Sequence, residues 1–183
     1  MSPRIRLFVT GGTFDKEYDE IHGTLEFRET HLPDMLAMAR SRLDVQVHML
    51  MMVDSLEMTE VDRDMIANNC LEVAEPHVVI THGTDTMVDT ARVLAQRVEG
   101  KTIVLTGAMI PIAFGSSDGL FNLGGALAVV QVLPPGVYIT MNGRIFDWYD
   151  VRKNRETGMF EALRESARVR TPSDTSASRR PSS

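Results

Sequence analysis

Two short turns that combine glycine with threonine are the strongest chemical signal in this chain. Residues 10–13 (TGGT) follow one apolar run, and residues 81–86 (THGTDT) follow another. Such runs predict buried strands, and in an α/β protein ligands bind beyond the carboxyl ends of the parallel strands. Because glycine lets the backbone bend tightly and approach a ligand, the hydroxyls of Thr13 and Thr84 are candidate nucleophiles.

A threonine hydroxyl is a weak nucleophile until a neighbouring base removes its proton. Asp85 is adjacent to Thr84, and Lys153 follows the last predicted hairpin. A lysine shielded from water beside a carboxylate can transfer a proton at neutral pH, because burial lowers its pKa. Taken alone, each threonine is more often a helix cap or turn former, but two such turns at strand ends favour a functional site.

The other chemical motifs are weak. Gly100-Lys101-Thr102 resembles the end of a Walker A loop, but Ala95 stands where that loop needs glycine. His82 is predicted to be packed and hydrogen-bonded, and Asp118 to cap a helix. The single cysteine, Cys70, is predicted to be a small buried hydrophobe. We therefore predict neither a metal site nor a cofactor.

Strands and helices are predicted to alternate along the chain. The fold class is therefore α/β, a mostly parallel sheet with helices on both faces in a Rossmann- or flavodoxin-like three-layer arrangement. Asn142-Gly143 is a strong hairpin signal, so residues 144–151 should return as a C-terminal β-hairpin at the sheet edge. Capping pairs are expected at Thr59 with Asp62 and at Thr86 with Asp89.

The strands are predicted at residues 5–10, 45–50, 77–80, 103–105 and 137–141, and the helices at residues 31–42, from residue 59, from residue 86, and at residues 120–133. Because the last helix is apolar nearly all round, we expect it to be deeply buried.

Composition limits the class of protein. The chain has 183 residues and a net charge of −6, which argues against nucleic acid as its main partner. Its apolar runs are shorter than the roughly 18 residues of a transmembrane helix, and the N-terminus lacks a signal-peptide apolar segment. We therefore expect a cytoplasmic protein with no membrane partner. Residues 1–165 are expected to form one domain, and residues 166–183, rich in Ser, Arg and Pro, a disordered tail.

The motifs resemble those of the bacterial-type L-asparaginases. Residues 10–13 are similar to the first signature of that family, and residues 81–87 (THGTDTM) to the second and more specific one. Residues 54–59 (DSLEMT) resemble its substrate-holding loop, residues 105–109 (LTGAM) its next strand, and Lys153 falls at its catalytic lysine. The resemblance implies an amidohydrolase that converts L-asparagine into L-aspartate and ammonia, with weaker action on glutamine.

The resemblance also implies roles for individual residues. Thr13 would be the nucleophile that attacks the side-chain amide, with Tyr18 beside it on a mobile loop. Thr84, Asp85 and Lys153 would form a second catalytic group, in which Thr84 activates water or substrate and Lys153 relays a proton.

Substrate binding is implied at four residues, namely Ser55, Gly83, Thr84 and Asp85. Ser55 would hold the α-carboxylate, and Asp85 the α-amino group. Because free asparagine is a zwitterion, a site that offers both a donor and an anion suits it.

Two departures from the family pattern are visible. Longer members have a second domain that supplies an acid behind the first Thr-Tyr pair, and this chain resembles the short, single-domain type. Glu17, Asp19 or an acid from a partner chain would have to replace that acid. Leu56 also stands where the family often has a polar residue.

Two alternatives to an asparagine amidohydrolase remain. One is a non-catalytic domain that binds Asp or Asn, and the other is an amidase that acts on a larger substrate. A homodimer or homotetramer is expected in each case.

Overall fold

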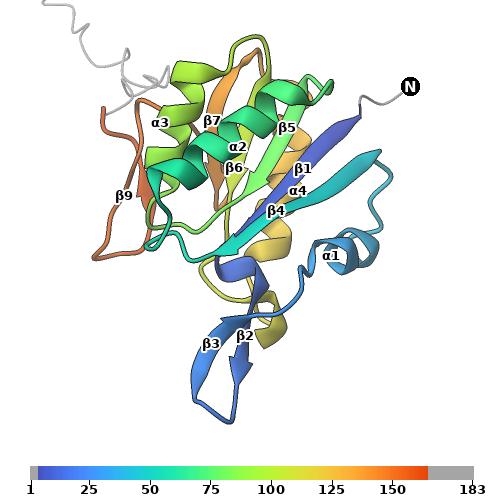
Figure 1. The fold of residues 1–183 in the computed structure, drawn as a ribbon, viewed down its shortest axis with the longest axis vertical. Helices are drawn as coiled ribbons and strands as arrows, with labels where there is room; N and C mark the ends of the chain where they lie inside the picture. Colours follow the sequence, from blue (N-terminus) through green and yellow to red (C-terminus); the bar gives the residue numbers. More distant parts are fainter. Residues whose placement is uncertain (1–3, 165–183) are drawn as a thin grey trace, which may run out of the picture.

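The computed structural model describes residues 4–164 and shows a six-stranded sheet with helices on both faces (Figure 1). The strand order is β4-β1-β5-β6-β7-β8, in which only β8 runs antiparallel to its neighbour. The sheet strands are β1 (Ile5–Gly11), β4 (Val45–Val53), β5 (His77–Thr81), β6 (Thr102–Thr106), β7 (Gly136–Met141) and β8 (Arg144–Asp147). The α/β class and the antiparallel edge strand predicted from sequence are thus confirmed. The tail predicted at residues 166–183 lies outside the described residues.

Two apolar layers enclose the sheet. On one face α2 (Glu60–Glu72) and α3 (Met87–Arg97) pack through Ile66, Cys70 and Leu94. On the other face α1 (Leu32–Met38) and α4 (Gly119–Val129) bury Met35 and Leu123. Cys70 is fully buried and burial raises the pKa of its thiol to about 12, which fits the predicted small hydrophobe. Within the described residues no helix is long and apolar enough to cross a membrane.

A small hairpin projects from the base of the sheet (Figure 1). The 3₁₀ turn η1 (Thr13–Asp15) leads into β2 (Lys16–Asp19), which pairs antiparallel with β3 (Thr24–Phe27). The family resemblance implied a mobile loop here; in the structure residues 16–27 form a two-stranded hairpin, and their mobility stays a prediction. A second small pair follows the main sheet, formed by β9 (Arg152–Lys153) and β10 (Phe160–Glu161).

Two predictions about caps need correction. The Thr59 capping box at α2 is present as predicted, but Thr86 makes no side-chain cap at α3 and donates its hydroxyl to the Ser55 carbonyl at 2.7 Å. Asp118 likewise makes no cap at α4. Its carboxylate accepts hydrogen bonds from the backbone N–H groups of Met109 and Ile110, across the turn that contains η2 (Ile112–Phe114), because that turn offers unpaired donors.

Helix α4 is less buried than its composition predicts. Its buried side follows the helical period through Asn122, Leu123, Ala126 and Leu127, while Phe121 is 66% exposed. The expectation of a deeply buried helix was wrong because a two-faced layer covers only one side of each helix.

Candidate active site

The two glycine–threonine turns meet where the strand order of the sheet reverses. Strand β1 lies between β4 and β5, so the connection from β4 crosses over β1 before β5 is added. In open α/β sheets ligands bind at such a switch point, outside the carboxyl ends of the strands. The turn at residues 10–13 ends β1 and the turn at residues 81–86 ends β5, so both stand at this point. The Thr10 hydroxyl ties the two ends together by donating to the Thr81 carbonyl at 2.8 Å.

Glycine is required where the turns touch. Gly12 has a φ of 89°, and a Cβ on it would lie 2.5 Å from the backbone nitrogen of Gly83. A Cβ on Gly83 would in turn lie 2.5 Å from the Oγ atom of Ser55. The absence of side chains at these two positions therefore brings the Thr13 turn, the Thr84 turn and the Ser55 loop into direct backbone contact.

Lys153 completes the constellation that the sequence predicted. Its Nζ donates to Oγ1 of Thr84 at 2.7 Å and to Oδ1 of Asp85 at 2.8 Å. The Lys153 side chain is only 12% exposed and Thr84 is buried. The short β9–β10 pair, in which Lys153 lies opposite Phe160, positions the lysine. A hydroxyl, an ammonium and a carboxylate in this order can accept, carry and release a proton.

Ser55 lies on the loop between β4 and α2, and it is almost completely buried. The hydroxyl of Thr86 holds the Ser55 carbonyl, so the turn that carries Thr84 also fixes the Ser55 loop. Beside it, a cavity of about 240 Å³ is lined by Leu56, Asp85, Met109, Lys153, Arg155 and Gly158. The sequence did not single out Thr86, Met109 or Arg155 as parts of the site. The only sequence signal for these three residues was their position: Thr86 follows residues 81–85, Met109 follows residues 105–108, and Arg155 lies two residues after Lys153.

His82 plays a structural role at this end of the sheet. It is fully buried, and its Nδ1 lies 2.7 Å from the carbonyl oxygen of Gly83, which only an N–H group can bond. Its Nε2 lies 2.7 Å from the Thr90 hydroxyl. Burial lowers the pKa of His82 to about 4, so the ring is neutral at pH 7 and braces the turn, as the sequence predicted.

Among the described residues no hydrogen bond joins Thr13 to Tyr18. Thr13 is half-buried at the start of η1, and Tyr18 is 55% exposed on β2. The Tyr18 hydroxyl points toward the tip of the hairpin, 3.9 Å from where a Cβ on Gly23 would lie. Among the described residues the structure gives the Tyr18 hydroxyl no partner in the site, and its role beside Thr13 stays a prediction.

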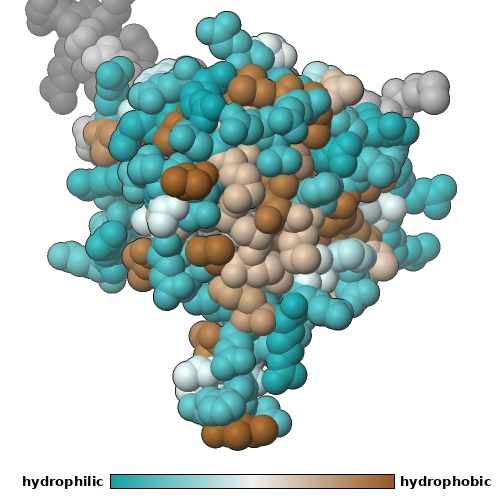
Figure 2. Space-filling model, viewed as in Figure 1, coloured by the Kyte–Doolittle hydropathy of each residue, from teal (hydrophilic) through white to brown (hydrophobic). Residues whose placement is uncertain are grey.

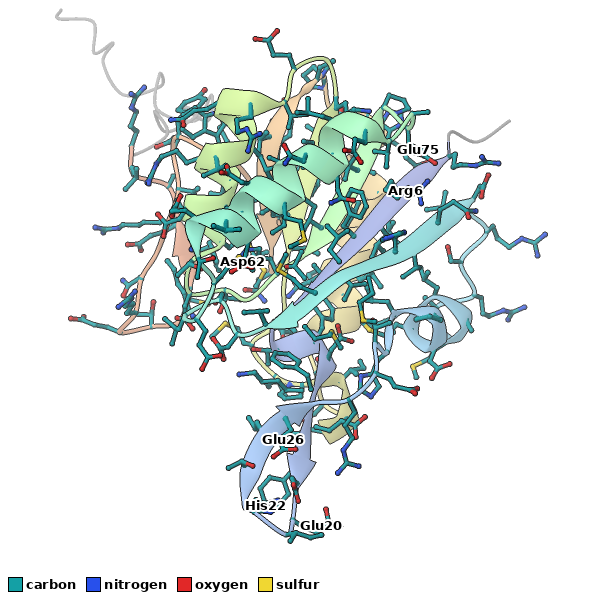
Figure 3. All side chains as sticks on the ribbon, viewed as in Figure 1. Arg6, Glu20, His22, Glu26, Asp62 and Glu75 are labelled. Carbon is teal, nitrogen blue, oxygen red and sulfur yellow. The ribbon has the colours of Figure 1, made fainter. Side chains whose placement is uncertain are left out.

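The two acids expected to support Thr13 are engaged elsewhere. Oδ1 of Asp19 accepts from the Ile21 backbone N–H at 2.8 Å, and Oδ2 of Asp19 lies 2.7 Å from Nδ1 of His22. Glu17 contacts His31 at 3.1 Å. Asp19, His22 and Glu26 place ligand atoms within 4.8 Å of one another, but Figure 3 shows His22 and Glu26 on the projecting hairpin. That cluster therefore belongs to the hairpin turn and not to the threonine site.

Comparisons with known proteins agree with this geometry. The sequence matches the family described as "Asparaginase, N-terminal" over residues 4–175. L-asparaginase 1 of Escherichia coli (strain K12) is 34% identical over 169 residues, which cover 84% of this chain and 46% of that protein. The structure of L-asparaginase I from Vibrio cholerae matches with a TM-score of 0.78 at 28% identity, covering 88% of this chain and 52% of that one. The thermostable L-asparaginase from Thermococcus kodakarensis matches with a TM-score of 0.77 at 27% identity, covering 87% of this chain and 51% of that one. The chain thus spans about half the length of these relatives.

Proposed function

The chain belongs to the asparaginase family, and from this premise we propose that it hydrolyses the side-chain amide of L-asparagine to L-aspartate and ammonia. The observation that carries the proposal is Lys153, whose ammonium nitrogen joins Thr84 to Asp85 at the switch point of the sheet. A binding site alone has no need of a lysine beside a buried threonine.

In the proposed reaction Thr13 attacks the amide carbon, its hydroxyl proton passes to the amide nitrogen, and ammonia leaves as the carbon–nitrogen bond breaks. Water then attacks the resulting ester on Thr13, one of its protons returns to the Thr13 oxygen, and L-aspartate is released. Lys153 relays the proton of Thr84, or of a water that Thr84 holds, and Asp85 stabilises the positive charge on the lysine. Backbone N–H groups of the Thr84 turn would stabilise the oxyanion, and one such donor is worth roughly 3–4 kcal/mol.

Ser55 and Asp85 are the proposed contacts for the two charged ends of the substrate. The Ser55 hydroxyl would donate to the α-carboxylate, and Asp85 would receive the α-ammonium, with Gly83 and Thr84 completing the wall. The side chain of Asp85 is 37% exposed while Lys153 holds one of its oxygens, so a carboxylate edge is accessible to an incoming ammonium. Glutamine is one methylene longer, and we propose weaker activity on it.

A second candidate function is a domain that binds Asp or Asn without catalysis. The exposure of Tyr18 favours it, because the hydroxyl expected beside Thr13 lies near Gly23 at the hairpin tip and has no hydrogen-bond partner in the site among the described residues. Ammonia release measured with L-asparagine and L-glutamine, together with calorimetric binding of L-aspartate, separates the two. Turnover supports the amidohydrolase, and binding of L-aspartate without ammonia release supports the binding domain.

We also propose that the chain acts as a homo-oligomer. Strand β4 is a sheet edge with no charged residue between Asp44 and Asp54, and its Met49 is 54% exposed. Figure 2 shows hydrophobic residues gathered in the middle of the face where Figure 1 places β4. A long apolar edge strand exposes unpaired backbone groups that a second strand can bond, so self-association would satisfy both features.

A further inference from the structure

A buried acid lies directly under the turn that carries Thr13. Asp15 closes η1 with a hydrogen bond from its backbone N–H to the Gly12 carbonyl at 3.3 Å, and its side chain has no exposed surface. Oδ1 of Asp15 accepts the backbone N–H of His31 at 2.8 Å. The carboxylate therefore fastens the turn after β1 to the start of α1, sixteen residues further along the chain.

Two buried polar atoms of this pair are left without a hydrogen-bond partner. Oδ2 of Asp15 and Nδ1 of His31 are both buried, and within the described residues neither makes a hydrogen bond. Nδ1 of His31 lies 3.6 Å from Oδ1 of Asp15, just beyond hydrogen-bond range. Burial raises the pKa of Asp15, which means that the charged carboxylate is held at an energetic cost. An apolar residue would fill this space more cheaply, so packing alone does not account for the pair.

The other nitrogen of the His31 ring reaches the projecting hairpin. Nε2 of His31 lies 3.1 Å from Oε1 of Glu17 on β2, and Arg28 approaches the second oxygen of Glu17 at 3.8 Å. The imidazole thus stands between one carboxylate on the Thr13 turn and another on the hairpin. A 3₁₀ turn of three residues has poor hydrogen-bond geometry of its own and needs such outside support.

We propose that Asp15 and His31 are positioning residues that fix the Thr13 turn, and through Glu17 the hairpin, at the proposed catalytic site. This inference rests on the proposed function for its kinetic consequence, but the contacts themselves do not. A small ring movement brings Nδ1 of His31 onto Asp15, and Thr13, two residues before Asp15, is then held in one orientation. The Ser55, Asp85 and Lys153 contacts do not depend on this pair.

Two amide variants of His31 separate its two ring contacts. The bond from the His31 backbone N–H to Asp15 stays in both variants. His31→Asn keeps an amide nitrogen near the position of Nδ1, beside Asp15, whereas His31→Gln places one near Nε2 and keeps only the side-chain contact with Glu17. We expect His31→Gln to lower kcat on L-asparagine by about tenfold with KM within about twofold, because a small misplacement of a reacting group slows chemistry more than binding. His31→Asn is expected to keep most of the wild-type kcat. Asp15→Asn, which preserves the acceptor for the His31 N–H and changes Oδ2, should behave like His31→Gln.

The control is Glu26→Gln, because Glu26 lies opposite Glu17 on the hairpin and bonds only Thr24 among the described residues. A second readout needs no activity: the amide resonances of Gly12 and Thr13 in the ¹⁵N-labelled full chain. These should shift in His31→Gln and Asp15→Asn and stay in place in Glu26→Gln. Equal kcat in His31→Asn and His31→Gln, or unmoved Thr13 resonances in His31→Gln, would overturn the proposal. If the wild type releases no ammonia, the proposed function fails, while the resonances still decide whether the pair positions Thr13.

Discussion

At the scale of single residues, the proposed chemistry depends on one lysine nitrogen with two partners. Lys153 comes from a two-residue strand far along the chain, yet it reaches Thr84 and Asp85 at hydrogen-bond distance. Because its side chain is nearly buried, solvent competes weakly for these bonds. The same side chain can therefore orient the Thr84 hydroxyl and exchange a proton with it.

Replacing Lys153 with methionine keeps the length of the side chain and removes the proton carrier. Lys153→Met is expected to lower kcat/KM on L-asparagine by at least about 100-fold, or roughly 2.7 kcal/mol of transition-state stabilisation. Arg152→Met is the matched control, since Arg152 precedes Lys153 on β9 and pairs with Glu161 on the surface. Loss of activity in the control, or its retention in Lys153→Met, would contradict the assigned role.

Two aspartates should show opposite effects of pH on stability. Burial raises the pKa of Asp15, so its carboxyl group favours folding in acid and ceases to do so as the pH rises past the raised value. Hydrogen bonds from Thr59 lower the pKa of Asp62, so its contribution is present above the ordinary carboxyl pKa and is lost as the pH falls through the lowered value. Urea unfolding at about pH 7 and about pH 3 measures both effects.

The free energy of unfolding of each variant, minus that of the wild type, gives the test. For Asp15→Asn this difference should be larger at neutral pH than in acid, and for Asp62→Asn it should be larger in acid than at neutral pH. If this difference changes with pH in the same direction in both variants, the titration of these two carboxyl groups is not its cause. An acid that costs stability at neutral pH and still occupies the Thr13 turn fits a functional role.

At the scale of elements, the sequence predicted the parts whose burial gives a clear pattern. Strands β1, β5 and β6 are apolar runs, and the Thr59–Asp62 capping box marks the start of α2. The β2–β3 hairpin was missed because half of its strand residues are charged and few are buried, which hides the alternation of a strand. The orientation of Tyr18 could not be predicted either, since it depends on a hairpin that the pattern did not reveal. Thr84, Asp85 and Lys153 were singled out from their residue types and places after strands, the family resemblance then gave them roles, and their contact follows from topology.

Asp118 offers a test at this scale. Its carboxylate accepts from Met109 and Ile110 and also from Nδ2 of Asn122, so it ties the turn after β6 to α4. Asp118→Ala is expected to lower the free energy of unfolding by about 2–3 kcal/mol, because charged acceptors of backbone N–H groups are the stronger kind. Thr59→Ala, which removes a helix cap, should cost only about 1 kcal/mol. Equal losses in the two variants would show that Asp118 contributes no more stability than an ordinary helix cap.

At the scale of the whole molecule, the exposed edge of β4 should decide assembly. We expect sedimentation velocity at micromolar concentration to show a species larger than the 20.4 kDa chain. Met49→Lys should dissociate it, because a lysine on an edge strand opposes pairing with another strand. Met38→Lys on α1 changes a methionine that is at least as exposed but lies away from this edge, and it should leave the assembly intact. A wild type that sediments only as the single chain would contradict the proposal.

Ammonia release from L-asparagine by the wild type, measured beside Thr13→Ala and Thr84→Ala, tests the central claim most directly. The account predicts turnover by the wild type and a loss of at least about 100-fold in each variant, since both hydroxyls take part in the reaction. Wild-type levels of ammonia release in either variant would contradict the two-threonine mechanism. A wild type that binds L-aspartate but releases no ammonia would contradict the assignment as an amidohydrolase.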